Sequence, residues 1–245
     1  MAKDHFISVT FLNNFTDNQQ VAEAREKTVF CFSNNTKSFN DQLSKLGKIA
    51  YQKDLDGDGD FRCKLNNYEQ KWTGLYSKIT QNNFLEQDYE EVLMYLFLLK
   101  LNNPKQQKDR IDLLLTQATP LEVKHLDSLK FKVKHKQTRD ILIGSKYIET
   151  LTIEYLTRPY RIVKNVSSVP FVTSDNPWLS FKDYQFIPIS KEFALQICTK
   201  LYVEMGGRNQ GLHVLSDSTD VRIVNSLMIR NAERFVYASS KDVFD

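Results

Sequence analysis

The chain of 245 residues carries 33 Lys and Arg against 30 Asp and Glu, a formal net charge of +3 that does not by itself indicate a polyanionic partner. With 41% hydrophobic and 26% charged residues, the composition excludes a disordered chain and predicts a globular protein with a sizeable core. Three widely spaced cysteines without a CxxC pair argue against a disulfide framework and a zinc site. The most apolar window, 92–101, is too short to cross a bilayer, so we expect a cytoplasmic protein with no membrane association.

The first half of the chain shows mainly helical spacing of apolar residues. The expected elements are a short helix within 5–15 (with a strand as the alternative), a strand at 28–32, and helices at 39–53, 65–79, 88–101 and 108–117. Segment 126–148 is ambiguous, because its centre alternates with the period of a strand while its flanks suit a long amphipathic helix. We favour the helix, since no turn residue interrupts the segment before Gly144.

From residue 150 onward, short runs rich in β-branched and aromatic residues predominate. Strands are expected at 151–156, 160–163, 170–173, 186–189, 193–198 and 235–238. A helix is expected over 220–233, with Asp217, Ser218 or Thr219 as its N-cap.

This order of elements predicts an α+β fold in a single domain, 1–245, with a helical part at about 36–149 and a strand-rich part at 150–245. The helical middle is expected to pack on a mixed or antiparallel sheet formed mainly by residues 150–200. The amino-terminal and carboxy-terminal strands are expected to join that sheet.

The stretch 170–178 ends an apolar run in small polar residues and a proline. Phe171 and Val172 favour a strand, whereas Ser174, Asp175 and Asn176 are residue types that favour tight turns. Pro177 lacks an N–H group and restricts the residue before it, so the strand is expected to stop there. The predicted result is a rigid strand-to-turn edge that presents a carboxylate and an amide.

Five blocks, in order, resemble the domain-of-unknown-function 4238 family. They are His5-Phe6-Ile7-Ser8 with Leu12 and Phe15, the strand 29–32, the glutamate-bearing helix from Tyr68-Glu69 to Ile79, the signature 170–177, and Asn225 with 231–238. The chain departs from the family pattern in two places. Ser8 replaces a proline of the opening motif, and 100–104 replaces a segment that usually holds glutamine and arginine. The resemblance implies a fold and a site but no reaction.

The catalytic candidates are His5, Asp175, Asn176 and Asn225. If the amino-terminal segment packs against the strand edge, His5 and Asp175 share one pocket. His5 would then act as a general base or metal ligand, and Asp175 as its orienter or as a second metal ligand. The alternative is structural: Asp175 caps a turn and His5 packs against an aromatic ring.

Substrate-binding candidates come from the turn, the late helix and a basic stretch. They are Ser174, Arg222, Arg230, Lys132 and Lys134. Arg222 and Asn225 are expected on one side of the late helix, where an arginine can bind an anion. The basic stretch 124–139 suits contact with a phosphate backbone, and a solvated helix face is the alternative reading.

An acidic loop at residues 54–60 matches the first positions of a calcium-binding EF-hand loop. Its candidate metal ligands are Asp54, Asp56, Asp58 and Asp60. The twelfth position, which should be a bidentate glutamate, is Leu65. An acidic solvated loop is therefore the competing interpretation, and a divalent cation is the one cofactor that the sequence leaves open.

The leading functional hypothesis is a nuclease-like phosphodiester hydrolase that acts on nucleic acid, in a bacterial defence or conflict setting. It depends on the pairing of His5 and Asp175 beside a basic segment. The alternative is a non-catalytic interaction or sensor module of a defence-type complex, in which the turn is scaffolding and the basic stretch contacts a protein partner.

Overall fold

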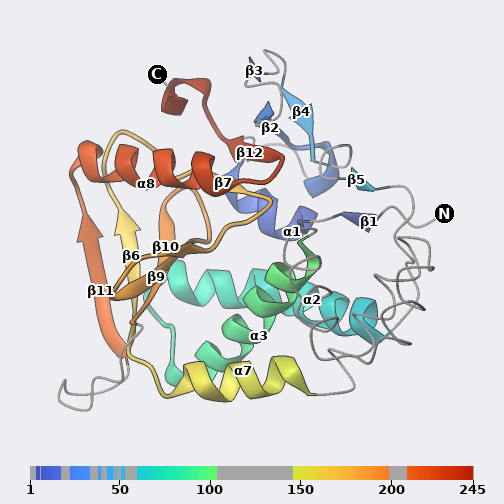
Figure 1. The fold of residues 1–245 in the computed structure, drawn as a ribbon, viewed down its shortest axis with the longest axis vertical. Coiled ribbons are helices and arrows are strands. Elements are labelled where there is room, and N and C mark those ends of the chain that lie inside the picture. The colour runs from blue at the N-terminus through green and yellow to red at the C-terminus, as the bar shows by residue number, and fades with distance from the viewer. Residues whose placement is uncertain are drawn as a thin grey trace, which may run out of the picture.

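The computed structural model describes residues 4–5, 7–17, 23–33, 38–39, 43–46, 48, 51–52, 60–103, 146–198 and 209–244. Within these residues, helices pack against two main β-sheets, one mixed and one antiparallel (Figure 1). The predicted α+β class is confirmed.

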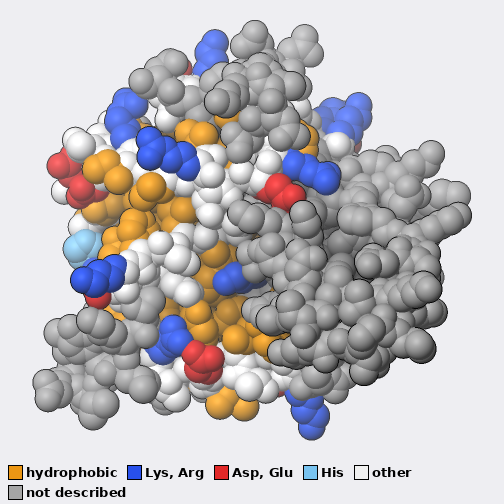
Figure 2. Space-filling model, in the orientation of Figure 1, with side chains coloured by type: hydrophobic (Ala, Val, Ile, Leu, Met, Phe, Trp, Pro, Cys, Tyr) orange, Lys and Arg blue, Asp and Glu red, His pale blue; other side chains and the backbone are white. Residues whose placement is uncertain are grey.

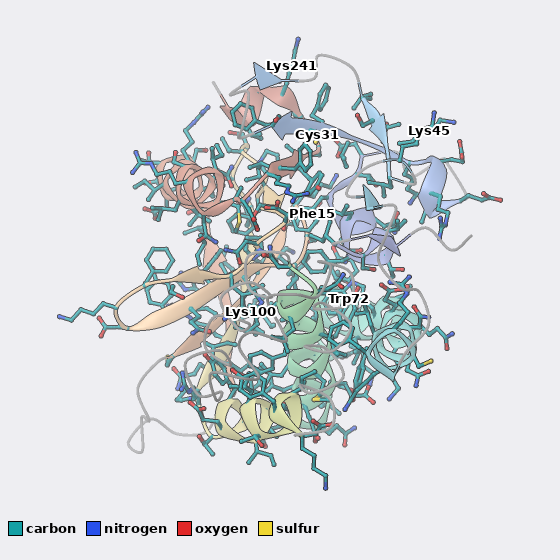
Figure 3. The ribbon with its side chains drawn as sticks, turned by 45° about the vertical axis from the view of Figure 1, so that its right-hand side comes forward. Phe15, Cys31, Lys45, Trp72, Lys100 and Lys241 are labelled. Atoms are coloured by element: carbon teal, nitrogen blue, oxygen red, sulfur yellow. The ribbon has the colours of Figure 1, made fainter. Side chains whose placement is uncertain are left out.

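Three helices build one side of the core: α2 (Asp60–Thr80), α3 (Glu86–Asn102) and α7 (Tyr147–Leu156). α3 is central because its residues are apolar almost all round, and every residue from Val92 to Leu99 is buried. α2 contributes an apolar stripe that includes Leu65, Trp72 and Ile79. Figure 3 shows Trp72 in the space between α2 and α3, where its ring lies 4.8 Å from that of Tyr95.

The mixed sheet has the strand order β11-β6-β10-β9-β8. Its strands are β6 (Tyr160–Asn165), β8 (Leu179–Ser180), β9 (Tyr184–Pro188), β10 (Phe193–Cys198) and β11 (Asn209–Leu215). Only the β11–β6 pair is parallel among these strands. One face joins the core around α3, and the other packs against α8 (Ser218–Asn231). β10 is buried on both faces, which explains why it is apolar except for Gln196.

The antiparallel sheet joins segments from both ends of the chain. Its strands are β2 (Thr28–Ser33), β3 (Ser38–Phe39), β4 (Ser44–Lys45), β7 (Thr173–Ser174) and β12 (Phe235–Ala238). β12 lies between β2 and β7, so the terminal strands meet the signature turn in a sheet of their own. Separately, β1 (Asp4–His5) pairs with β5 (Tyr51–Gln52).

Short helical turns complete the described fold: α1 (Val9–Leu12), η1 (Asn13–Phe15), η2 (Ala24–Glu26) and η3 (Lys241–Phe244). α1 and η1 confirm the short helix predicted within 5–15. Ser8 caps α1, because its hydroxyl accepts hydrogen bonds from the backbone N–H groups of Thr10 and Phe11 at 3.1 and 3.4 Å.

Most of the predicted elements that fall on described residues are confirmed. Strands β2, β6, β9, β10 and β12 and helices α2, α3 and α8 match the expected segments within a few residues. Asp217 is the N-cap of α8, with its carboxylate accepting from the Thr219 N–H at 2.7 Å. The helix predicted at 108–117 and most of the segment 126–148 lie outside the described residues.

Two predictions were wrong. The helix expected over 39–53 is replaced by the short strands β3, β4 and β5, because Leu46 and its neighbours pair with the segment around β2 instead of forming a helical face. The strand expected over 151–156 is part of helix α7, whose Ile148, Thr152 and Tyr155 face inward at helical spacing. The β-branched residues of this segment favoured a strand, but the helical spacing of its buried residues identifies a helix.

In the strand-rich part after residue 150, the two strands β8 and β11 were not predicted. β8 is only two residues long, and β11 contains Gly211, with φ of 75° beside a register shift against β6. Such a bulge breaks the alternating pattern that identifies strands. Within the described part of the chain, no helix combines the length and the apolar character that a bilayer crossing needs.

Candidate functional site

Asp175 is a structural clamp in the signature turn. It is buried, and its carboxylate accepts hydrogen bonds from the backbone N–H groups of Glu233, Arg234 and Phe235 at 2.9, 2.8 and 3.4 Å. These three amides form the connection between α8 and β12. The carboxylate therefore holds that connection against β7.

Burial also changes the acidity of Asp175. Desolvation raises the pKa of its carboxyl from 3.8 to about 6, and the three backbone hydrogen bonds offset only part of this effect. The backbone of Asp175 is also held in place, because the side-chain amide of Asn103 donates a hydrogen bond to the Asp175 carbonyl. The residue thus links the end of α3, β7 and the start of β12.

Asn225 and Asn176 are used in the same structural way. The side-chain oxygen of Asn225 accepts from the Val172 N–H at 3.1 Å, and its amide donates to the Pro170 carbonyl at 2.9 Å. Asn176 donates to the carbonyl of Asn231 at 3.3 Å, and Asn231 donates back to the carbonyl of Asn176 at 2.9 Å. These bonds fasten the segment before and after the turn to α8.

Asn225 also explains why the strand predicted at 170–173 is short. Only Thr173 and Ser174 pair with β12, because Asn225 takes the hydrogen bonds of Pro170 and Val172. Ser174 is fully buried, and its hydroxyl accepts from the Asn176 N–H at 3.1 Å. It is therefore part of the turn and has no surface open to a substrate.

The remaining predicted residues are dispersed. Arg222 and Arg230 are exposed on α8, whereas Asn225, one turn from Arg222 along the helix, is buried. The backbone of His5 pairs with Tyr51 in the β1–β5 ladder, which Figure 1 shows apart from β7. The side chains of the following predicted residues lie outside the described part of the structure: His5, Lys132, Lys134, Asp54, Asp56, Asp58 and Asp60.

A different polar pocket lies between the amino-terminal segment and α2. It has a volume of about 310 Å³ and is lined by Ser8, Val9, Thr10, Glu23, Ala24, Arg25, Arg62 and Glu69. Arg62 and Glu69 are seven residues apart on α2, two helical turns, and so lie on the same face of the helix. α1 and η2 supply the other walls.

Glu69 is the chemically distinctive group of this pocket. Burial raises the pKa of its carboxyl above the usual value, while a hydrogen bond with Ser8 and the charges of Arg62 and Arg25 act in the opposite direction. A carboxyl group with a raised pKa can act as a proton acceptor, and the two guanidinium groups beside it can bind an anion.

An aromatic cluster supports the pocket from behind. Trp72 packs against Phe11 at 5.9 Å and against Tyr95 at 4.8 Å between ring centroids. Burial raises the pKa of Tyr95 well above its usual value, and the charge of Glu69 adds to this shift. The Tyr95 hydroxyl lies near Ser8 and Glu69 but makes no hydrogen bond of good geometry with the described residues. This apolar backing keeps Glu69 poorly solvated.

The sequence contained a signal for Glu69 that was not used. Leu65, Glu69 and Trp72 recur at spacings of four and three residues, so the glutamate occupies a position on the buried stripe of α2. An acidic residue on an apolar helical stripe requires a partner or a function. Arg25 carried no comparable signal, because only the tertiary fold brings η2 beside α2. Among the described residues, no three metal-ligating side chains come together.

The family model described as "Protein of unknown function (DUF4238)" matches residues 3–242. The chain belongs to the DUF4238 family. This match extends over both sheets and the helices between them, so the pocket and the signature turn both lie within the DUF4238 region. No curated protein and no solved structure matches the chain.

Proposed function

We propose that the chain is a phosphodiester hydrolase that acts on nucleic acid, with the pocket around Glu69 as its active centre. The observation that supports this proposal is the convergence of a poorly solvated carboxyl group and two arginines, Arg25 and Arg62, in one pocket of about 310 Å³. Phosphodiester hydrolysis needs a group that accepts a proton from water and cations that hold the phosphate.

In the proposed reaction, Glu69 is the general base. Its carboxylate accepts a proton from a water molecule as the water oxygen attacks phosphorus, and the bond from phosphorus to the leaving oxygen breaks. The raised pKa brings Glu69 closer to neutrality, where a general base is most effective. The leaving oxygen takes its proton from solvent or from a second acid.

Arg25 and Arg62 are the proposed phosphate ligands. Guanidinium groups bind phosphate through paired hydrogen bonds and stabilise negative charge that develops on the non-bridging oxygens. Arg62 projects from the same face of α2 as Glu69, and Arg25 comes from η2 on the opposite wall. This arrangement supports a phosphate position between the two arginines and beside the carboxylate.

His5 retains a role in the proposal as a second proton-transfer group, because it lies only three residues before Ser8, which lines the pocket. Asp175, Asn176 and Asn225 become structural residues, since the protein backbone already uses their side chains.

The test is cleavage of labelled single-stranded RNA, single-stranded DNA and duplex DNA, each with Mg²⁺ and with Mn²⁺. Glu69→Gln keeps the shape of the side chain but removes the base, and we expect a rate at least about 100-fold below the wild type. Glu90→Gln is the matched control, because Glu90 is exposed on α3 outside the pocket. Folded wild-type protein that cleaves none of these substrates would reject the proposal.

The alternative, a non-catalytic interaction module, is supported by a separate observation. Leu212 and Val214, which are two residues apart on β11 and so share one face of this strand, are large apolar side chains with exposed fractions of 41% and 53%. Exposed apolar groups that gather in one place are typical of interaction surfaces. A folded, inactive wild type that forms a stable complex with a protein partner, lost on substitution of Val214 by a charged residue, supports this alternative.

A further inference from the structure

A second hollow lies on the α8 face of the mixed sheet, on a different part of the fold from Glu69. It has a volume of about 270 Å³. Figure 2 shows apolar side chains gathered on this face of the molecule, over α8 and the strands beside it, with a histidine at the margin. Apolar and aromatic side chains form the larger part of its lining, and its polar residues are Arg161, Gln196, His213 and Asp220. A mainly apolar lining with some polar groups is usual for a small-molecule site.

The sheet register explains how the polar groups come together. Arg161 on β6 is directly opposite Gln196 on β10, and Gln196 is opposite Phe186 on β9, so the three side chains form one row on one face. The next row, Val163 and Ala194, is buried under α8. The hollow is therefore the part of this face beside α8, where Arg161 is half-buried and Gln196 is buried at the base.

Arg161 has hydrogen-bonding capacity to spare. Its Nε donates to the side-chain oxygen of Gln196 at 2.8 Å, which orients the guanidinium and leaves the terminal N–H groups unused by that bond. Arg161 forms no ion pair with a carboxylate of the described residues. Asp220 lies at the exposed rim, where solvent screens its charge. An oriented arginine without a carboxylate partner favours an anionic group.

The wall of the hollow is aromatic. Phe181, just after β8, and Tyr184, the first residue of β9, stack with ring centroids 4.6 Å apart and an interplanar angle of 21°. Both rings are half-buried, and Phe186 lies beneath them in the sheet. Flat aromatic walls gain most from packing against another ring. The volume is at the small end for ligand sites, which suits a ligand with a single ring.

We propose that this hollow binds a small aromatic anion, whose carboxylate or phosphate group pairs with Arg161 and whose ring packs against Phe181 and Tyr184. Gln196 holds the arginine in position and offers its own amide to the same anionic group. This site is independent of the proposed hydrolase centre, so the failure of one proposal leaves the other intact.

The experiment measures binding by calorimetry and ligand-detected NMR with three probes: phenylacetate, phenyl phosphate and the neutral phenylacetamide. The first two probes distinguish a carboxylate from a phosphate ligand. Arg161→Met is expected to weaken the preferred anion about tenfold or more, since a hydrogen bond to a charged group contributes that much, while leaving phenylacetamide nearly unchanged. Lys164→Met is the matched control, because Lys164 lies on β6 with the alternate side-chain orientation and outside the hollow.

Phe181→Ala is the second variant. Phe181 lies between the strands β8 and β9 and is half-buried against the core under α8, so urea unfolding of the variant accompanies the binding measurement. In folded protein the substitution tests the ring contact, and it should weaken all three probes alike. The proposal is overturned if neither anion binds, if Arg161→Met weakens the neutral probe as much as the anions, or if Lys164→Met has the same effect as Arg161→Met.

Discussion

Replacing Asp175 by alanine tests whether the signature turn is structural. The substitution removes the acceptor for three backbone N–H groups, from Glu233, Arg234 and Phe235. Two of these bonds, at 2.8 and 2.9 Å, have the length expected of charge-assisted hydrogen bonds, and the third, at 3.4 Å, is weak. In Asp175→Ala the amides stay in a partly buried connection without a protein acceptor.

The magnitude follows from two opposing effects. A buried donor that loses its partner costs about 1–3 kcal/mol, and two strong donors are affected. The variant also removes the cost of burying a charge, which for Asp175 is large enough to raise its pKa. We therefore expect the free energy of unfolding at pH 7 to fall by about 2–4 kcal/mol, which leaves a typical domain folded.

The pH dependence provides a sharper test. The pKa of Asp175 is about 6 in the folded chain, against 3.8 normally, so the folded state binds a proton that the unfolded state has released. The stabilisation of the folded state by this bound proton is fully present below the pKa of Asp175 in the unfolded chain. It is lost as the pH rises through the pKa of Asp175 in the folded chain. Wild-type stability should fall by roughly 3 kcal/mol relative to Asp175→Ala between about pH 4 and pH 7.

Urea unfolding followed by tryptophan fluorescence measures both quantities, because Trp72 and Trp178 are buried and report on the core. The urea concentration at the unfolding midpoint should shift, while the dependence of the unfolding free energy on urea concentration stays constant. If the gap between wild type and variant widens as the pH rises over this range, the three amides outweigh burial and the reasoning is refuted. If Asp175→Ala is fully stable but cleaves no nucleic acid, the turn is catalytic and not structural.

Three further predictions concern the buried polar groups and the proposed centre. Asn225→Leu should lower the thermal midpoint and cost about 2–4 kcal/mol, because the Val172 N–H and the Pro170 carbonyl lose their partners; an unchanged melting temperature contradicts this role. Tyr237→Phe should leave the chain as stable or up to about 1 kcal/mol more stable in urea, since the Tyr237 hydroxyl is buried without a hydrogen-bond partner among the described residues; a loss of 2 kcal/mol or more reveals a missing partner. Arg62→Met should weaken inhibition of cleavage by inorganic phosphate more than it changes folding, and equal inhibition in both proteins removes Arg62 from the phosphate site.

The sequence was sufficient for elements whose local pattern agrees with their final packing. Helix α3 is apolar almost all round and lies at the centre, and β10 and β12 are mainly apolar runs that form strands at the predicted residues. The turn residues from Ser174 to Pro177 also behave as their chemistry indicates. In each case the local preference and the tertiary environment favour the same structure.

The candidate site was less predictable, because its geometry depends on contacts between distant segments. The N–H groups that donate to the Asp175 carboxylate could not be inferred from its neighbours, since they are about sixty residues away along the chain. Likewise Glu69 meets Arg25 only when η2 packs beside α2. Sequence reasoning located polar residues with special roles, but it could not distinguish a carboxylate that binds the backbone from one that faces a pocket.

The most direct test of the central claim is the pH dependence of phosphodiester cleavage, with bis(4-nitrophenyl) phosphate as a chromogenic substrate that needs no nucleic-acid recognition. The account predicts that the wild-type rate falls as the pH is lowered and Glu69 becomes protonated, which gives the pH–rate profile an acidic limb. The Glu90→Gln variant should keep this acidic limb. Glu69→Gln should be at least about 100-fold slower and should lack the limb. A Glu69→Gln protein that cleaves at the wild-type rate, with the same pH profile, contradicts the assignment of Glu69 as the catalytic base.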